Sequence, residues 1–253
     1  MTKESFRTRL KSGEMLYGTL LSLSSLEAAE ILAASGFDWL FVDKEHSVLD
    51  PAQVQNVLQA VAGRADCILR IPLNDEIWIK KALDTGATGI MVPQVNTAEE
   101  ARRAVRLSKY APLGTRSVGV SRAHGYGATL ADYLQRANDE TVIVVQAEHI
   151  QAVENIESIL DVEGIDAVLV GPYDLSASMG LMGQVDSPEV QEAIAQVRRA
   201  CRARGMPLGI FAVSGRRAHD YAADGFTLLA GSSDTLMLVQ AAHNTLNELR
   251  GAS

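Results

Sequence analysis

The chain has 253 residues, 47% of them hydrophobic, and a formal net charge of −8. This balance is typical of a globular chain and excludes a disordered or fibrous one. The acidic excess argues against a nucleic-acid partner, because binding phosphates requires a basic face.

A short pattern recurs four times along the chain: the tail of a helix, a glycine and a short apolar run. The four glycines are Gly36, Gly86, Gly164 and Gly225. A glycine just past a helix tolerates positive φ and ends the helix. The apolar runs lack polar alternation, which is typical of strands buried on both faces of a parallel sheet.

This pattern predicts eight strands, at 16–22, 38–43, 67–71, 88–92, 142–147, 165–170, 208–212 and 226–230. Helical spacing of apolar residues predicts helices over 25–35, 97–108 and 188–204, whereas 110–130 lacks periodicity and predicts a long loop with short helical turns. Eight strands alternating with helices predict an α/β fold, the (β/α)8 TIM barrel. The alternative is an open doubly wound sheet, but the GxGxxG that would favour it is absent after the first strand. No linker interrupts the pattern, so we expect residues 1–253 to form a single domain.

The sequence also predicts where the protein resides. It has no run of 18 apolar residues, so we expect no membrane partner. The N-terminus is charged and unlike a secretory signal, and Cys67 and Cys201 are too few for a disulfide framework. We therefore expect a cytoplasmic protein.

Unusual polar residues follow the predicted strands at the end where a barrel of this kind places its active site. They are Asp43, Glu45 and His46 after the second strand, Arg70 at the end of the third, Gln94 after the fourth, Gln146 and Glu148 at the fifth, and Tyr173 and Asp174 after the sixth. Any one of them has a structural explanation, such as Asp174 capping a helix. Their convergence favours a functional site.

Two carboxylates at adjacent strand ends, Glu148 and Asp174, are suited to bind one divalent cation and leave room for a bidentate 2-oxo acid. Oxygen ligands favour Mg²⁺, Mn²⁺ or Co²⁺ over a structural zinc. Pro172 has no N–H, so the amides of Tyr173 and Asp174 are the donors available to a substrate carboxylate.

The remaining polar residues predict proton transfer and charge stabilisation. Arg70 offers a fixed positive fork for an enolate oxygen. His46 titrates near neutral pH and can move a proton. Asp43, three residues earlier, is placed to orient the His46 ring and raise its basicity.

Short motifs lie at 36–43, 45–46, 69–75, 80–87, 89–93, 110–116, 146–148 and 171–176. Through these motifs the sequence resembles the HpcH/HpaI aldolase family over about residues 17–235. The resemblance implies a class II, metal-dependent pyruvate aldolase that reversibly cleaves 4-hydroxy-2-oxo acids to pyruvate and an aldehyde. It assigns the metal to Glu148 and Asp174, acid/base catalysis to His46, and enolate stabilisation to Arg70.

The same resemblance implies that Gln146 and the Tyr173 backbone contact substrate, and that Asp84 raises the basicity of the histidine. Asp84 ends a predicted helix, on the face of its own barrel opposite the active site. It therefore either acts across a subunit contact or only caps local structure. The family is oligomeric, often hexameric, with its last barrel helix exchanged between subunits. The segment 234–249 is the candidate for that helix in a homo-oligomer.

Three departures from the family pattern, Lys44, Ser47 and His149, adjoin site residues and affect the expected substrate rather than the reaction. One alternative is a Schiff-base aldolase through Lys44, although the two acids beside it are expected to raise its pKa and weaken it as a nucleophile. The others are an acyl-CoA lyase of the malyl-CoA type, for which the acidic chain offers no basic patch, and a non-catalytic barrel that only binds a metabolite.

Overall fold

The computed structural model describes residues 4–251 of the chain. Within that range eight parallel strands close into a barrel, each pairing with the next in sequence and β8 with β1. They are β1 Leu16–Leu21, β2 Trp39–Asp43, β3 Asp66–Arg70, β4 Gly89–Val92, β5 Val142–Ala147, β6 Ala167–Val170, β7 Leu208–Ala212 and β8 Leu228–Ser233. The predicted (β/α)8 barrel is confirmed, and every predicted strand overlaps an observed one.

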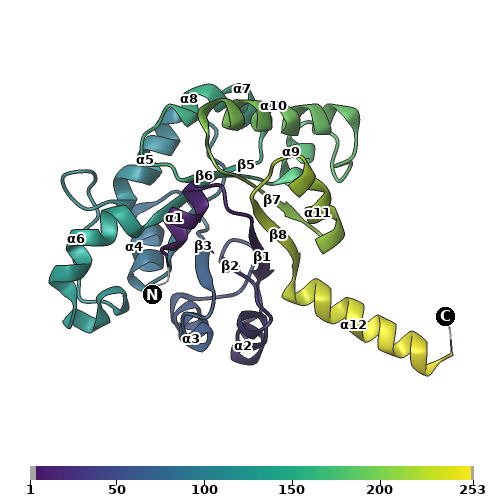
Figure 1. Ribbon diagram of the computed structural model, residues 1–253, viewed down its shortest axis with the longest axis horizontal. Coiled ribbons are helices and arrows are strands. Elements are labelled where there is room, and N and C mark those ends of the chain that lie inside the picture. Colours follow the sequence, from purple (N-terminus) through teal and green to yellow (C-terminus); the bar gives the residue numbers. More distant parts are fainter. Residues whose placement is uncertain (1–3, 252–253) are drawn as a thin grey trace.

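Helices connect the strands and surround the barrel (Figure 1). They are α1 Phe6–Lys11, α2 Leu26–Ala34, α3 Pro51–Val61, α4 Glu76–Asp84, α5 Ala98–Ser108, the 3-10 helix η1 Arg122–Gly127, α6 Leu130–Glu140, α7 Ile150–Glu154, α8 Ile156–Leu160, α9 Pro172–Ser178, α10 Pro188–Arg204, α11 Gly215–Ala223 and α12 Asp234–Leu249. The predicted helices correspond to α2, α5, α10 and α12. The expected long loop contains η1 and the start of α6.

Local chemistry explains where these helices begin and end. Thr97 caps α5 in a capping box: its side chain accepts from the Glu100 N–H, and the Glu100 carboxylate accepts from the Thr97 N–H. Gly205 ends α10 at φ +63°, a conformation that glycine adopts without a Cβ clash.

The apolar side chains form two layers on either side of the strands. Side chains from β1 to β8 fill the barrel interior, among them Leu16, Trp39 and Phe41. The amino-terminal end of the barrel is closed by α1, whose Arg7 pairs with the buried Asp166 at 2.7 Å. The second layer lies between the strands and the helices. Burial on both faces explains why the strands read as continuous apolar runs.

The last helix, α12, projects away from the barrel (Figure 1). Large apolar side chains are exposed along it, namely Leu236, Leu238, Val239, Leu246 and Leu249. In residues 4–251 no helix is both long and apolar enough to cross a membrane. Cys67 and Cys201 are buried free thiols.

Candidate active site

The register between β2 and β3 places Asp43 directly beside Arg70. Both side chains are buried, and the guanidinium donates to both carboxylate oxygens, Nε to Oδ1 at 2.9 Å and Nη2 to Oδ2 at 2.8 Å. The Phe41 ring lies 4.9 Å below the guanidinium. Nη1 is the guanidinium nitrogen that this two-point ion pair does not use, and it lies 3.3 Å from the Glu45 carboxylate.

The turn after β2 is organised by the same carboxylate. Asp43 Oδ1 accepts from the backbone N–H of Glu45 at 3.0 Å and of His46 at 3.4 Å. The predicted contact between Asp43 and the His46 ring is wrong, because Arg70 and these amides occupy the carboxylate. The carboxylate nearest the exposed imidazole belongs to Glu45, whose Oε2 is 3.8 Å from Nε2.

Glu148 is fixed just beyond the end of β5. Its Oε1 accepts from the Gln94 N–H at 2.9 Å, and its Oε2 accepts from the Gln146 side-chain amide. A Cβ at Gly171 would lie 2.9 Å from Glu148 Oε2, so the residue after β6 must be glycine for the carboxylate to lie there. Gln146 Oε1 is buried and has no hydrogen-bond partner among the described residues.

Asp174 and Tyr173 begin α9, with Pro172 at its first position. Both are exposed, and within residues 4–251 no hydrogen bond or ion pair occupies the Asp174 carboxylate. First-turn N–H groups have no partner inside a helix, so the Tyr173 and Asp174 amides keep the donor capacity that the sequence predicted.

Electrostatics at these strand ends favour a bound cation. Asp43, Glu45, Glu148 and Asp174 provide four carboxylates, against one guanidinium from Arg70. Burial raises the pKa of Glu148 to about 7; the Gln94 hydrogen bond opposes the increase, and the charges of Glu45 and Asp174 add to it. Burial also raises the pKa of Glu45. Such buried like charges become stable together when a cation shares them.

The residues fit a divalent cation held by two protein carboxylates. No group of three or more His, Cys, Asp or Glu side chains in the described residues has metal-binding geometry, so a closed structural zinc site is not formed there. The oxygens of Glu148 and Asp174, with the unpartnered Gln146 Oε1 nearby, match the ligand chemistry of Mg²⁺ or Mn²⁺.

A cavity of about 190 Å³ opens at this end of the barrel. Among its lining residues are five that the sequence predicted for the site, His46, Arg70, Gln146, Tyr173 and Asp174. The others are Leu20, Phe41, Gly171, Pro172 and Phe211. The size suits a small metabolite rather than a drug-sized ligand.

Asp84 lies away from this cavity, at the end of α4. It pairs with the buried Arg116 at 2.9 Å, and the Arg116 guanidinium lies 4.6 Å from the Tyr110 ring. Within one chain Asp84 is therefore not brought to His46.

Lys44 also points away from the cavity. Its Nζ donates to the Leu49 carbonyl at 2.8 Å and lies 4.5 Å from the Trp78 ring. Burial lowers its pKa, with Asp50 opposing, so the expected increase in the Lys44 pKa was wrong. The neighbouring acids do not dominate, because Asp43 and Glu45 are turned toward Arg70.

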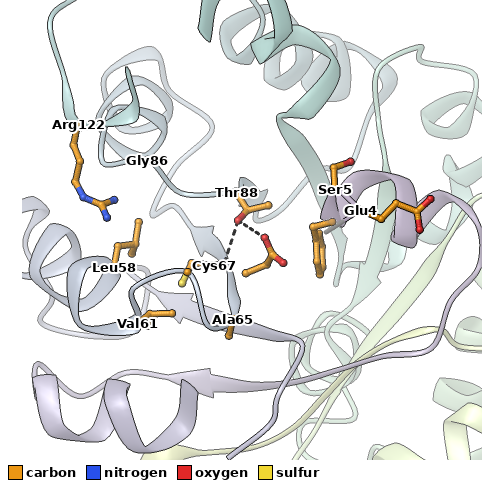
Figure 2. A pocket seen from close by; sticks show the side chains of 12 residues that line it. Glu4, Ser5, Leu58, Val61, Ala65, Cys67, Gly86, Thr88 and Arg122 are labelled. Atoms are coloured by element: carbon orange, nitrogen blue, oxygen red, sulfur yellow. Dashed lines mark hydrogen bonds between the residues drawn. The ribbon is translucent and has the colours of Figure 1, made fainter. Parts of the chain in front are cut away.

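A second cavity, of about 270 Å³, lies at the amino-terminal ends of the strands. Figure 2 shows Arg122 and Gly86 on one side of it and Glu4 and Ser5 on the other. Burial raises the pKa of the Cys67 thiol in its wall to about 12, so that thiol is unreactive. The polar cluster of the strand ends is at the opposite mouth.

The sequence placed Glu45 and Gln94 at strand ends but predicted no contact for them, and it predicted no role for Gly171. Glu45 contacts both Arg70 and His46, the Gln94 backbone N–H holds Glu148, and Gly171 makes room for it. A glycine between an apolar run and Pro172 was a detectable signal, whereas the contact of Gln94 depends on tertiary structure.

The fold and the site define a (β/α)8-barrel protein with a cavity at the carboxyl ends of its strands, lined by His46, Arg70 and Asp174 among others. Residues 16–241 match the family model described as HpcH/HpaI aldolase/citrate lyase, and the chain belongs to this family.

Individual relatives agree with that membership. The chain is 42% identical to a 4-hydroxy-2-oxo-heptane-1,7-dioate aldolase of Escherichia coli, over 95% of this chain and 92% of that protein. It superposes on an HpcH/HpaI aldolase/citrate lyase family protein from Burkholderia cenocepacia J2315 with a TM-score of 0.93 and 38% identity, covering 96% of this chain and 98% of that one. An HpcH/HpaI aldolase from Desulfitobacterium hafniense DCB-2 gives a TM-score of 0.91 and 34% identity, covering 97% and 96%.

Proposed function

We propose that this chain is a class II pyruvate aldolase, a carbon–carbon lyase that reversibly cleaves 4-hydroxy-2-oxo acids to pyruvate and an aldehyde. Family membership supports the reaction class. The observation that carries the proposal is the buried Glu148 carboxylate, whose pKa is raised by burial. Together with the exposed Asp174 carboxylate it is suited to bind one cation, near the cavity that Arg70 and His46 line.

The family is divalent-metal dependent. In this chain Glu148 and Asp174 would hold the ion, which we propose to be Mg²⁺, Mn²⁺ or Co²⁺. When bound, it supplies Lewis-acid polarisation of the 2-oxo acid. Gln146 and the N–H groups of Tyr173 and Asp174 orient the substrate carboxylate, and the cavity walls limit water around it.

Arg70 and His46 perform the charge and proton steps in our proposal. Arg70 Nη1 stabilises the enolate oxygen, while Asp43 holds the guanidinium in place through the two-point pair. In cleavage His46 accepts the 4-hydroxyl proton as the C3–C4 bond breaks. His46 then returns this proton to C3 of the enolate, which gives pyruvate. Glu45 lies beside the imidazole, with Oε2 3.8 Å from Nε2.

Further expectations remain predictions. We propose that residues 1–253 form one aldolase domain, that α12 is exchanged in a homo-oligomer, often a hexamer in the family, and that the protein is cytoplasmic. Asp84 then reaches a histidine only across a subunit contact. The apolar side chains exposed along α12 support this exchange, because a second subunit would bury them.

The test is pyruvate release from a panel of 4-hydroxy-2-oxo acids, before and after chelation and with each metal added back. We expect activity to disappear with chelator and return with a divalent ion. Unchanged activity after thorough chelation would contradict the proposal, and the absence of turnover with any metal would favour a non-catalytic binding barrel.

A further inference from the structure

Arg116 is a buried cation that lies between two tyrosine rings. Its side chain is fully enclosed within the chain, with an exposed fraction of 0%. The guanidinium lies 4.6 Å from the centre of the Tyr110 ring and 5.8 Å from that of the Tyr133 ring, and its Nη1 donates to the Tyr133 hydroxyl at 3.1 Å. A planar guanidinium held by two aromatic rings and a hydrogen bond has a fixed orientation.

This fixed guanidinium holds one oxygen of Asp84 and leaves the other available. Arg116 Nη2 donates to Asp84 Oδ1 at 2.9 Å. Within residues 4–251 no hydrogen bond engages Asp84 Oδ2, and the side chain is 27% exposed. Asp84 is therefore an oriented carboxylate with one oxygen open to a donor from outside its own chain.

The stability of the fold alone does not explain this pair. Burial removes the hydration of the Arg116 guanidinium, and its Nε is buried with no hydrogen-bond partner among the described residues. Apolar side chains of similar volume often replace such buried pairs without loss of stability. An apolar side chain between the two rings would not, however, fix the direction of the Asp84 carboxylate.

The surface around Asp84 is suited to contact a second copy of this chain. Four large apolar side chains are exposed on the segment 113–126, namely Leu113, Val118, Val120 and Tyr126. This segment contains Arg116, and Arg122 Nη1 links it to the end of α4 by donating to the Thr85 carbonyl at 2.6 Å. A second subunit, as in the proposed homo-oligomer, would cover these apolar side chains and meet the open oxygen of Asp84.

We propose that Arg116 is a positioning residue, which orients Asp84 so that its open oxygen accepts a hydrogen bond from His46 of the partner subunit. The inference rests on the proposed function, in which Asp84 reaches a histidine across a subunit contact. When His46 takes a proton from the substrate its ring becomes a cation, and a fixed carboxylate beside the ring stabilises that cation. Arg116 thus acts on the reaction through Asp84, without touching the substrate.

The first test compares two replacements of Arg116 that have similar reach. Arg116→Lys keeps a cation beside Asp84, whereas Arg116→Met keeps only apolar volume between the tyrosine rings. The assay is exchange of pyruvate methyl protons in D₂O with Mg²⁺, since the step in which His46 returns a proton to C3 runs in reverse there. We expect kcat to fall about a hundredfold in Arg116→Met and about tenfold in Arg116→Lys, with KM for pyruvate within about twofold of wild type.

A packing role for Arg116 predicts a different order. Arg116→Met would then be at least as active as Arg116→Lys, and that result would overturn the inference. Arg136→Met is the matched control, because it removes a surface ion pair with Glu140 on the neighbouring helix α6. Its kcat should equal that of the wild type.

The second test asks whether Arg116 and His46 act in different chains. Arg116→Met and His46→Ala are co-expressed with two different affinity tags, and hybrid oligomers are purified through both tags. Each parent alone should be nearly inactive. Statistical assembly places an intact His46 beside an intact Asp84–Arg116 pair at about one site in four, so the hybrids should recover about a quarter of the wild-type exchange rate.

Two results would contradict this arrangement: hybrids no more active than their parents, or a wild type that is fully active as a monomer. If Arg116→Met does not assemble, Arg116→Lys replaces it in the hybrids, with the same expected recovery. The wild type separates the two claims. A wild type with neither metal-dependent exchange nor pyruvate release would contradict the proposed function, whereas an active wild type with an equally active Arg116→Met would contradict only the role of Arg116.

Discussion

Replacing Glu148 by glutamine should stabilise the metal-free protein above neutral pH while abolishing metal binding. The pKa of Glu148 is raised from 4.5 to about 7, chiefly by burial. At about 1.4 kcal/mol for each pKa unit, keeping this carboxylate ionised in the metal-free fold costs about 3 kcal/mol. Glutamine carries no charge and avoids that cost.

The local hydrogen bonds favour the substitution. The new side-chain oxygen still accepts from the Gln94 N–H. The new amide nitrogen faces Gln146, whose Oε1 is buried without a partner among the described residues, so a flip of the Gln146 amide provides an acceptor. We therefore expect Glu148→Gln to fold.

The assay is urea unfolding of both proteins between pH 4 and 9, with chelator present. Because the folded-state pKa is the higher one, the native state binds more protons than the unfolded state between pH 4.5 and about 7. The Glu148 contribution is complete below pH 4.5 and is lost as pH rises through 7. The free energy of unfolding of the wild type should fall by about 3 kcal/mol relative to Glu148→Gln across this range. Added Mn²⁺ should restore it in the wild type alone. A pH-independent difference, or equal stabilisation of both by Mn²⁺, would refute the reasoning.

Three further outcomes test the site. Arg70→Ala leaves the buried Asp43 unpaired, so the free energy of unfolding should fall by about 3–5 kcal/mol and pyruvate methyl exchange should stop; normal exchange would remove Arg70 from the enolate step. Gly171→Ala places a Cβ 2.9 Å from Glu148 Oε2 and should weaken Mn²⁺ binding at least about tenfold; unchanged affinity in a calorimetric titration would mean that the loop yields without moving the carboxylate. Borohydride reduction with pyruvate should leave no adduct by mass spectrometry, because Lys44 faces Leu49 and Trp78; an adduct at Lys44 would restore the Schiff-base alternative.

The strands were predictable because the barrel buries them on both faces, so each appears as an apolar run flanked by turn residues. Ser187-Pro188 and the capping residues of α5 likewise marked their helices. The helix α1 was not predicted, since its six residues contain only Phe6 and Leu10 as buried side chains, too few to establish a period.

Residues at the strand ends were predictable as a set, but not their pairing. Asp43 is three residues from His46 in sequence, yet the register of β2 against β3 sets it beside Arg70. Such a register is fixed by tertiary structure, which the order of residues alone does not reveal. The contribution of Leu20 and Phe211 to the cavity lining was hidden for the same reason, because they are ordinary strand residues until the barrel closes.

The most direct test of the account is a titration of Mn²⁺ into the wild-type protein and into Asp174→Asn, with Asp132→Asn as a control. Asp132 and Asp174 both lie exposed in the first turn of a helix, α6 and α9 respectively. We expect one Mn²⁺ per chain in the wild type and in Asp132→Asn, and no measurable binding in Asp174→Asn. Equal affinity in all three proteins would contradict the claim that Glu148 and Asp174 share a cation.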